Sequence, residues 1–186
     1  MDELLEIFRD IDSLKHRERE GWKKIGVEGT RDTIASHSFG AAMMAWVLGE
    51  REGFDTDRLV KMLLMHDLVM AYVDDYTPED EGFDSKREEE NQVAEELIRD
   101  VPEEIRDEFR SLFQEFQAEE TRLASFAREC DKLETILQAY MYSRELGEDR
   151  LSEFIESYRD TFESYTGRQL LDSLENSDVT ETTGGS

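Results

Sequence analysis

Apolar residues recur every three to four positions along most of this chain, and no stretch alternates apolar with polar residues. That spacing lines one face of an α-helix, whereas a half-buried strand alternates. Near the start, for example, Leu4, Leu5, Phe8, Ile11 and Leu14 share one helical face. Only two prolines and 11 glycines interrupt the 186 residues, so long helices are possible. The sequence therefore predicts an all-α fold.

Capping residues, prolines and glycines divide this pattern into segments. Asp55 can cap one helix, the capping box at 85–88 opens another, and Pro102 falls in the first turn of a third. Loops are expected at 19–33 and 74–84. Helices are expected at about 4–14, 34–50, 55–72, from 85, from 102, at 121–145 and at 149–167 with a short addition to 174.

The chain is long enough for one domain with a substantial core. Aromatic residues make up 10% of it and recur at helical spacing, whereas a disordered acidic protein would lack them. We expect residues 1–175 to form that domain. Residues 176–186 are polar and lack core residues, which predicts a disordered acidic tail.

The charge balance is strongly acidic, with 47 Asp and Glu against 22 Lys and Arg and a net charge of −25. Such a surface repels phosphates and anionic lipids, so neither nucleic acid nor a membrane is expected as a partner. The acids are spread along the whole chain, which favours a folded domain with an acidic coat. This halophile-like composition suits a cytoplasm with high salt, where charges are screened over short distances.

Cysteine content and hydropathy bear on the compartment. The single cysteine, Cys130, excludes an internal disulfide and a CxxC zinc site. The opening residues are acidic without an apolar h-region, and the longest apolar-leaning stretch, 41–48, is too short to span a membrane. We therefore expect a soluble protein of a reducing cytoplasm.

Histidine and aspartate residues supply the candidate chemistry. His66 is followed by Asp67 in an apolar stretch, and His37 lies on the preceding predicted helix. Asp131 lies in the middle of a helix among core residues. A lone histidine on an apolar face is commonly a hydrogen-bonded core residue, but an unpartnered buried carboxylate is costly. A divalent cation would neutralise both carboxylates and use both imidazoles.

The order His37, His66-Asp67, Asp131 resembles the arrangement in HD-domain phosphohydrolases. The wider context resembles the branch that contains the 5′-deoxynucleotidases, in the segments 14–22, 75–80, 86–90 and 131–139. This resemblance covers about residues 10–175. It implies a helical bundle, commonly a homodimer, whose four ligand residues hold one divalent metal ion. It also implies hydrolysis of nucleoside 5′-monophosphates to nucleoside and phosphate.

The resemblance implies roles for further residues. A mixed nitrogen and oxygen ligand set suits Mn²⁺, Co²⁺, Fe²⁺, Zn²⁺ or Mg²⁺, so the identity of the metal stays open. The ion would polarise the phosphoryl group and lower the pKa of water, and Asp75 would serve as base or proton shuttle. Arg19 resembles the family's phosphate-binding arginine. Trp22 is expected either near the nucleoside or as a core anchor for its loop.

The chain also departs from the family pattern. Met70 stands where relatives carry Glu, three residues after Asp67, and should face the site one helical turn from His66. Asp74, beside Asp75, could compensate for this missing carboxylate. The other departures are Ser36, Asp32 and Leu123. The alternative to an enzyme is therefore a degenerate HD domain that binds metal and nucleotide as a sensor. A purely structural helical protein is a third possibility.

Overall fold

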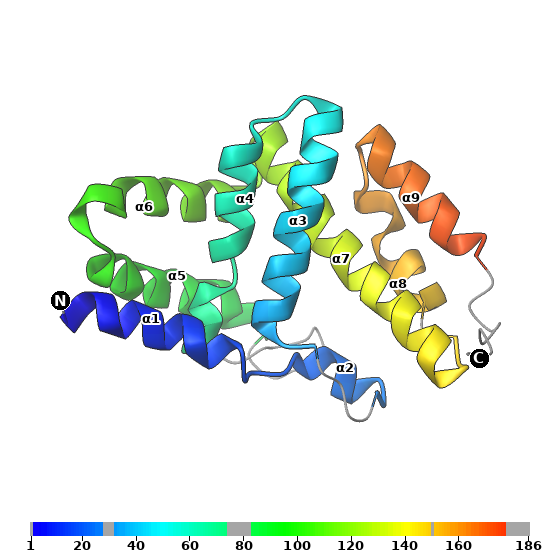
Figure 1. Ribbon diagram of the computed structural model, residues 1–186, viewed down its shortest axis with the longest axis horizontal. Coiled ribbons are helices and arrows are strands. Elements are labelled where there is room, and N and C mark those ends of the chain that lie inside the picture. Colours follow the sequence, from blue (N-terminus) through cyan, green and yellow to red (C-terminus); the bar gives the residue numbers. More distant parts are fainter. Residues whose placement is uncertain (1, 28–31, 74–82, 150, 178–186) are drawn as a thin grey trace, which may run out of the picture.

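The computed structural model describes residues 2–27, 32–73, 83–149 and 151–177, with side chains from residue 4 and, in the third range, from residue 91. Within those ranges the regular elements are helices, and one isolated antiparallel bridge joins Glu18 to Thr33 (Figure 1). The predicted all-α class is confirmed. No helix in the described part of the chain is long and apolar enough to cross a membrane.

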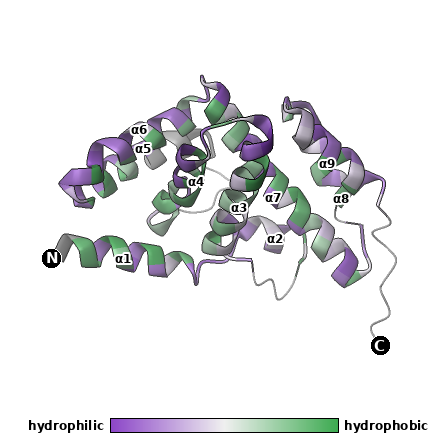
Figure 2. Cartoon of the chain, turned by 45° about the horizontal axis from the view of Figure 1, so that its top comes forward, coloured by the Kyte–Doolittle hydropathy of each residue, from purple (hydrophilic) through white to green (hydrophobic). Residues whose placement is uncertain are grey.

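Three helices form the centre of the molecule: α3 (Ile34–Glu52), α4 (Thr56–Met65) and α7 (Arg122–Leu146) (Figure 1). α3 packs against both of the others, and glycines permit the close approach. A Cβ at Gly49 would lie 2.9 Å from Leu59 of α4, and a Cβ at Gly40 would lie 2.9 Å from Glu134 of α7. Figure 2 shows hydrophobic colour along α3 and α7 in the middle of the molecule.

The remaining helices flank this centre (Figure 1). One side carries α1 (Asp2–Leu14), α5 (Phe83–Asp100) and α6 (Glu103–Ala118). The other side carries α8 (Leu151–Tyr158), the 3-10 helix η2 (Arg159–Thr161) and α9 (Tyr165–Glu175). The short helix α2 (Glu20–Lys24) lies in the segment 19–33, which was expected to be a loop without a helix.

Several predicted helix starts are confirmed by their caps. The side chain of Asp55 accepts a hydrogen bond from the backbone of Arg58, and Thr121 caps α7 in the same way. Pro102 is the N-cap of α6. α5 begins at Phe83, two residues before the expected start. α9 ends at Glu175, and residues 178–186 of the expected tail lie outside the described residues.

Two predicted helices are wrong, because each is broken. The helix expected to reach residue 72 ends at Met65, and the 3-10 helix η1 (Leu68–Ala71) follows after His66 and Asp67. The helix expected over 149–167 is divided into α8, η2 and α9. In both places a side chain hydrogen-bonds to the backbone and replaces the helical ladder.

Candidate active site

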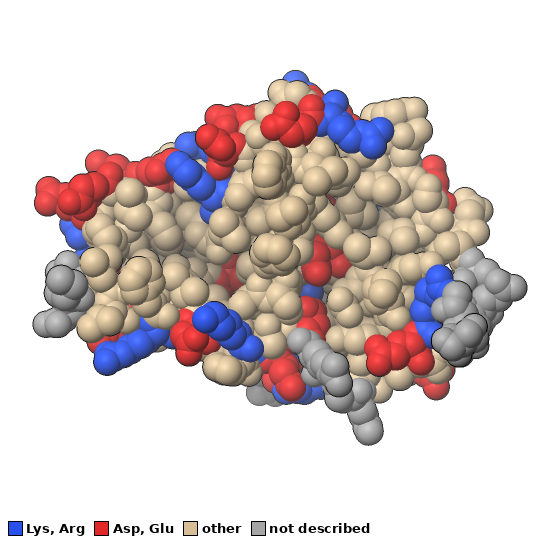
Figure 3. All heavy atoms as spheres, viewed as in Figure 1, with Lys and Arg blue, Asp and Glu red and all other residues tan. Residues whose placement is uncertain are grey.

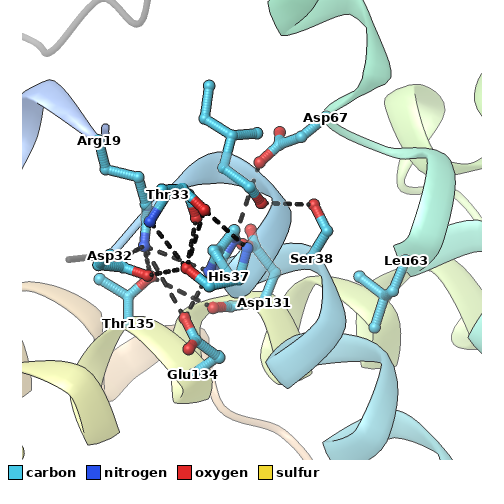
Figure 4. Close-up of polar contacts among 12 residues, drawn as sticks. Arg19, Asp32, Thr33, His37, Ser38, Leu63, Asp67, Asp131, Glu134 and Thr135 are labelled. Carbon is cyan, nitrogen blue, oxygen red and sulfur yellow. Dashed lines mark hydrogen bonds and ion pairs between the residues drawn. The ribbon is translucent and has the colours of Figure 1, made fainter. Parts of the chain in front are cut away.

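Four predicted ligand residues come together from three elements, and Figure 4 shows three of them, His37, Asp67 and Asp131. His37 lies in the first turn of α3, His66 and Asp67 occupy the break between α4 and η1, and Asp131 lies in α7. The break is essential to this arrangement, because consecutive residues on one helix point in different directions. Because α4 ends at Met65, the side chains of both His66 and Asp67 can face α3 and α7.

The donor atoms of these residues lie close together, at or slightly beyond the separations expected around one ion. His37 Nε2 is 2.9 Å from Asp131 Oδ1 and 3.8 Å from Asp67 Oδ2. His66 Nε2 is 3.3 Å from Asp67 Oδ2 and 3.7 Å from Asp131 Oδ1. Neighbouring ligands about 2.1 Å from a metal ion lie about 3 to 3.5 Å apart in octahedral or tetrahedral geometry. The described side chains therefore fit a divalent cation.

His66 supplies the clearest test of that fit. Its Nδ1 donates a hydrogen bond to the backbone carbonyl of Leu63 at 2.7 Å, so Nε2 is the nitrogen that can bind a metal ion once its proton is displaced. The side chain is almost fully buried, and Nε2 has no hydrogen-bond partner among the described residues. Buried polar atoms rarely stay unsatisfied, and a metal ion would satisfy this one.

His37 is held by a carboxylate from α7. Its Nδ1 lies 2.5 Å from Glu134 Oε2, so Nδ1 carries a proton and donates to this carboxylate, while Nε2 faces Asp131 Oδ1 at 2.9 Å. Gly40 has no side chain, and the Glu134 side chain occupies the space that a Cβ there would fill. Glu134 lies in the segment 131–139 that carries the family resemblance, but no role was predicted for it, because its partner lies 97 residues away in the sequence.

The electrostatics of the cluster favour a cation. Burial of the imidazole opposes its protonation, but the carboxylates of Asp67 and Asp131 outweigh this and raise the pKa of His66 to about 10. Burial likewise opposes ionisation of the two carboxyl groups, yet the histidines hold the pKa values of Asp67 and Asp131 below their usual range. Both carboxylates are therefore charged, and positive charge between them is strongly stabilised.

Arg19 lies at the edge of this cluster. Its Nη1 donates to Thr135 Oγ1 at 3.2 Å and lies 3.7 Å from Asp32 Oδ2 and 3.8 Å from Glu134 Oε2 (Figure 4). Burial would lower the pKa of Arg19, but Asp32 and the other nearby carboxylates raise it. The guanidinium therefore stays charged beside the four ligand residues.

Trp22 lies in the core. Its side chain is 2% exposed, its Nε1 donates to Asp32 Oδ2 at 2.7 Å, and its ring packs on Tyr142 and Phe154. Trp22 does not belong to the described lining of the site cavity. Its packing agrees with the expectation of a core anchor, and contact with a nucleoside stays a prediction.

The cluster opens into a cavity of about 170 Å³. Met70 is buried and lines it, although η1 rather than a continuous helix brings it there. The described lining residues are Arg19, Ile34, His37, His66, Asp67, Met70, Phe116, Gln117, Arg128 and Asp131. Phe116, Gln117 and Arg128 were not predicted from the sequence. Asp74 and Asp75, the expected proton acceptors, lie outside the described residues.

The other departures from the family pattern have structural roles here. Ser36 forms a capping box with Thr33 at the start of α3 and donates to Asp32 Oδ1 at 2.9 Å. Asp32 therefore joins Ser36 to Trp22. Leu123 is half-buried in the first turn of α7 and packs against the hydrophobic core.

Comparison with known proteins gives a consistent result. The sequence profile of the HD domain matches residues 11–170. The protein named 5′-deoxynucleotidase HDDC2 of Dictyostelium discoideum is 30% identical over 187 residues, covering 94% of this chain and 98% of that protein.

Solved structures share the fold. The crystal structure of PH0347 protein from Pyrococcus horikoshii OT3 superimposes with a TM-score of 0.74 at 31% identity, covering 95% of this chain and 98% of that one. The predicted metal-dependent phosphohydrolase from Magnetospirillum magnetotacticum MS-1 gives a TM-score of 0.68 at 26% identity, covering 94% and 92%.

Proposed function

The chain belongs to the HD-domain family, and we propose that it is a metal-dependent phosphohydrolase that cleaves nucleoside or deoxynucleoside 5′-monophosphates to nucleoside and phosphate. The observation that carries this proposal is the cluster of two imidazoles and two carboxylates in which buried His66 Nε2 has no hydrogen-bond partner among the described residues. The name of the relative from Dictyostelium supports the substrate class.

We assign His37, His66, Asp67 and Asp131 as the ligands of one divalent ion, whose identity among Mn²⁺, Co²⁺, Fe²⁺, Zn²⁺ and Mg²⁺ stays open. When bound, the ion supplies a positive charge that polarises a phosphoryl group and lowers the pKa of water.

The chain's own residues position the reactants. The carbonyl of Leu63 and the carboxylate of Glu134 fix the two imidazoles with Nε2 toward the cavity. Arg19 supplies a fixed positive charge for a phosphate oxygen. Asp75, helped by Asp74, would take the proton of the attacking water. Trp22 would contribute to the nucleoside side of the site through the loop that it anchors.

The second candidate is a sensor that binds metal and nucleotide with little turnover. Met70 favours it, because this thioether lines the cavity where relatives carry a carboxylate and cannot accept a proton.

A phosphate-release screen separates the two candidates. Purified protein is loaded with each of several divalent metals, its metal content is measured, and it is assayed with deoxyribonucleoside and ribonucleoside 5′-monophosphates. The enzyme proposal expects metal-dependent phosphate release from at least one nucleotide. Stoichiometric metal and nucleotide binding without release would establish the sensor instead.

We also propose a high-salt, reducing cytoplasm as the working environment. The acidic composition and the buried free thiol of Cys130 support this. The melting temperature is then expected to rise as KCl goes from dilute to molar concentrations, and a fall would contradict the proposal.

We propose that the protein is a homodimer formed through one face of α3 and α7. Large apolar side chains are exposed there: Phe39, Met43, Trp46, Val47, Leu137 and Met141. Together they expose on the order of 500 Å² of apolar surface, a size that marks interaction surfaces on soluble proteins. Figure 3 shows uncharged atoms over most of the centre of this face and charged side chains mostly near its edge.

A second copy is the partner that this face fits best. Two molecules of charge −25 repel each other, so a contact face without charged side chains favours their association. Trp46→Glu should convert the dimer to a monomer in light scattering, whereas Phe8→Glu, an equally apolar and exposed site on α1, should not. A monomeric wild type would overturn the proposal.

A further inference from the structure

A second arginine, Arg128, lines the cavity beside the four ligand residues. Arg128 lies on α7, three residues before Asp131 and therefore on the same helix face. Its guanidinium carbon is 3.8 Å from the ring centre of Phe116 on α6. That ring packs edge-on against His66 at 5.2 Å between centroids. The cation is thus held over an aromatic ring that itself contacts a ligand residue.

The two arginines of the cavity differ in their engagement. Arg19 gives its Nη1 to Thr135 and lies within 4 Å of two carboxylates. Arg128 has one neighbouring carboxylate, with its Nε 2.5 Å from Glu119 Oε1, but this N–H does not point at the oxygen and no hydrogen bond forms. Within the part of the chain that the structure describes, no hydrogen bond or ion pair engages the terminal nitrogens of Arg128. Its two terminal nitrogens therefore remain available as donors.

We propose that Arg128 binds the phosphate group of the substrate, a role that rests on the phosphohydrolase function proposed above. A phosphate monoester carries two negative charges on three terminal oxygens, more than one ion and Arg19 can satisfy. A guanidinium donates in its own plane, so stacking on Phe116 leaves its donor edge open and limits its rotation. On a protein of charge −25, a cation at the cavity also reduces the repulsion of an anionic substrate.

Binding of inorganic phosphate to the Mn²⁺-loaded protein tests this without any turnover. Arg128→Gln should weaken phosphate binding about 10- to 100-fold in calorimetry, since a hydrogen bond between charged groups is lost. Arg128→Lys should recover part of the affinity, because it restores the charge without the planar fork.

The matched control is Arg122→Gln. Arg122 lies on the same helix and over a phenylalanine, Phe54, at 5.5 Å, but does not line the cavity. The Arg122→Gln variant should bind phosphate with the same affinity as the wild type. Equal phosphate affinity in wild type and Arg128→Gln would overturn the proposal, as would a wild type that binds no phosphate at millimolar concentration. Circular dichroism and metal content should stay unchanged in all variants.

Kinetics with two substrates distinguish phosphate contact from base contact. If Arg128 binds the phosphate, Arg128→Gln should lower kcat/KM by a similar factor for a deoxynucleoside 5′-monophosphate and for deoxyribose 5-phosphate, which has no base. A loss confined to the nucleotide would overturn the proposal and place the guanidinium on the base. If the wild type releases no phosphate from any nucleotide, the phosphohydrolase proposal fails, whereas the calorimetric result still decides the role of Arg128.

Discussion

The two broken helices of this protein differ in what their breaks accomplish. Between α4 and η1, the His66 side chain takes the carbonyl of Leu63, and the break aims His66 and Asp67 at the cavity. Between η2 and α9, the buried Glu129 carboxylate accepts hydrogen bonds from the backbone of Glu163 and Ser164 and from the Ser164 hydroxyl. The same competition with the helix ladder builds a ligand site in one place and fixes a corner of the fold in the other.

This comparison predicts that a substitution at the first break, at His66 or Asp67, abolishes activity but does not unfold the protein. Asp67→Ala should lose the bound metal and lower phosphate release by about a thousandfold or more, because the ligand set is incomplete. The circular-dichroism spectrum should remain helical. Elemental analysis checks the first statement, and stoichiometric metal retained in both Asp67→Ala and Asp131→Ala would refute the assignment.

Restoring a carboxylate beside the first break should increase turnover. Met70 follows the break and lines the cavity, so Met70→Glu can reach water near the metal. We expect kcat to rise by about 10- to 1000-fold if a proton acceptor is missing. Single-turnover assays at saturating metal measure this, and Met70→Gln controls for polarity without basicity. A Met70→Glu variant that holds metal but gains no rate would show that proton transfer is solved elsewhere.

Metal binding at the first break should depend on pH. The carboxylates raise the pKa of His66 to about 10, so the metal-free protein carries a proton there at neutral pH. The incoming ion must displace it, and the apparent affinity should therefore rise with pH until about 10. Release of one proton predicts an increase of about 100-fold between pH 6 and pH 8. Titration of EDTA-treated protein with Mn²⁺ measures the slope, and an affinity independent of pH would contradict the protonated state.

A change at the second break should instead lower stability. Glu129→Ala leaves three part-buried donors without an acceptor and should reduce the free energy of unfolding by about 2 to 3 kcal/mol. Metal content per folded molecule should not change. Urea denaturation measures the difference, and Glu145→Ala, at an exposed position of the same helix, should be close to neutral. If Glu129→Ala lost its metal but kept its stability, the second break would have the same role as the first, which would contradict this comparison.

The smallest expected effect is that of salt. A dianionic substrate is repelled by the net charge of −25, and added KCl screens that repulsion. We expect KM to fall about two- to fivefold between low and molar KCl, with a smaller change in kcat. A KM that rises steadily with salt would mean that the local field of Arg19 and Arg128 outweighs the net charge.

The sequence predicted the helical class, most helix starts and the four residues of the cluster, because these depend on local spacing and on residue type. Asp55 and Thr121, for example, cap helices within three residues of their own position. It missed both breaks, because His66 looks like one more residue of an amphipathic helix and Glu129 acts on residues 34 and 35 positions away. Glu134 and Arg128 were missed for the same reason, since their roles exist only after α7 packs against α3 and α6.

The central claim is that the break at His66-Asp67 completes a metal site between α3 and α7. Crystals of the protein soaked with Mn²⁺ and measured for anomalous scattering would test it most directly. The account predicts one strong peak about 2.0 to 2.3 Å from His37 Nε2, His66 Nε2 and oxygens of Asp67 and Asp131. A fully loaded crystal without a peak between these four side chains, or with its only peak among surface carboxylates, would contradict it.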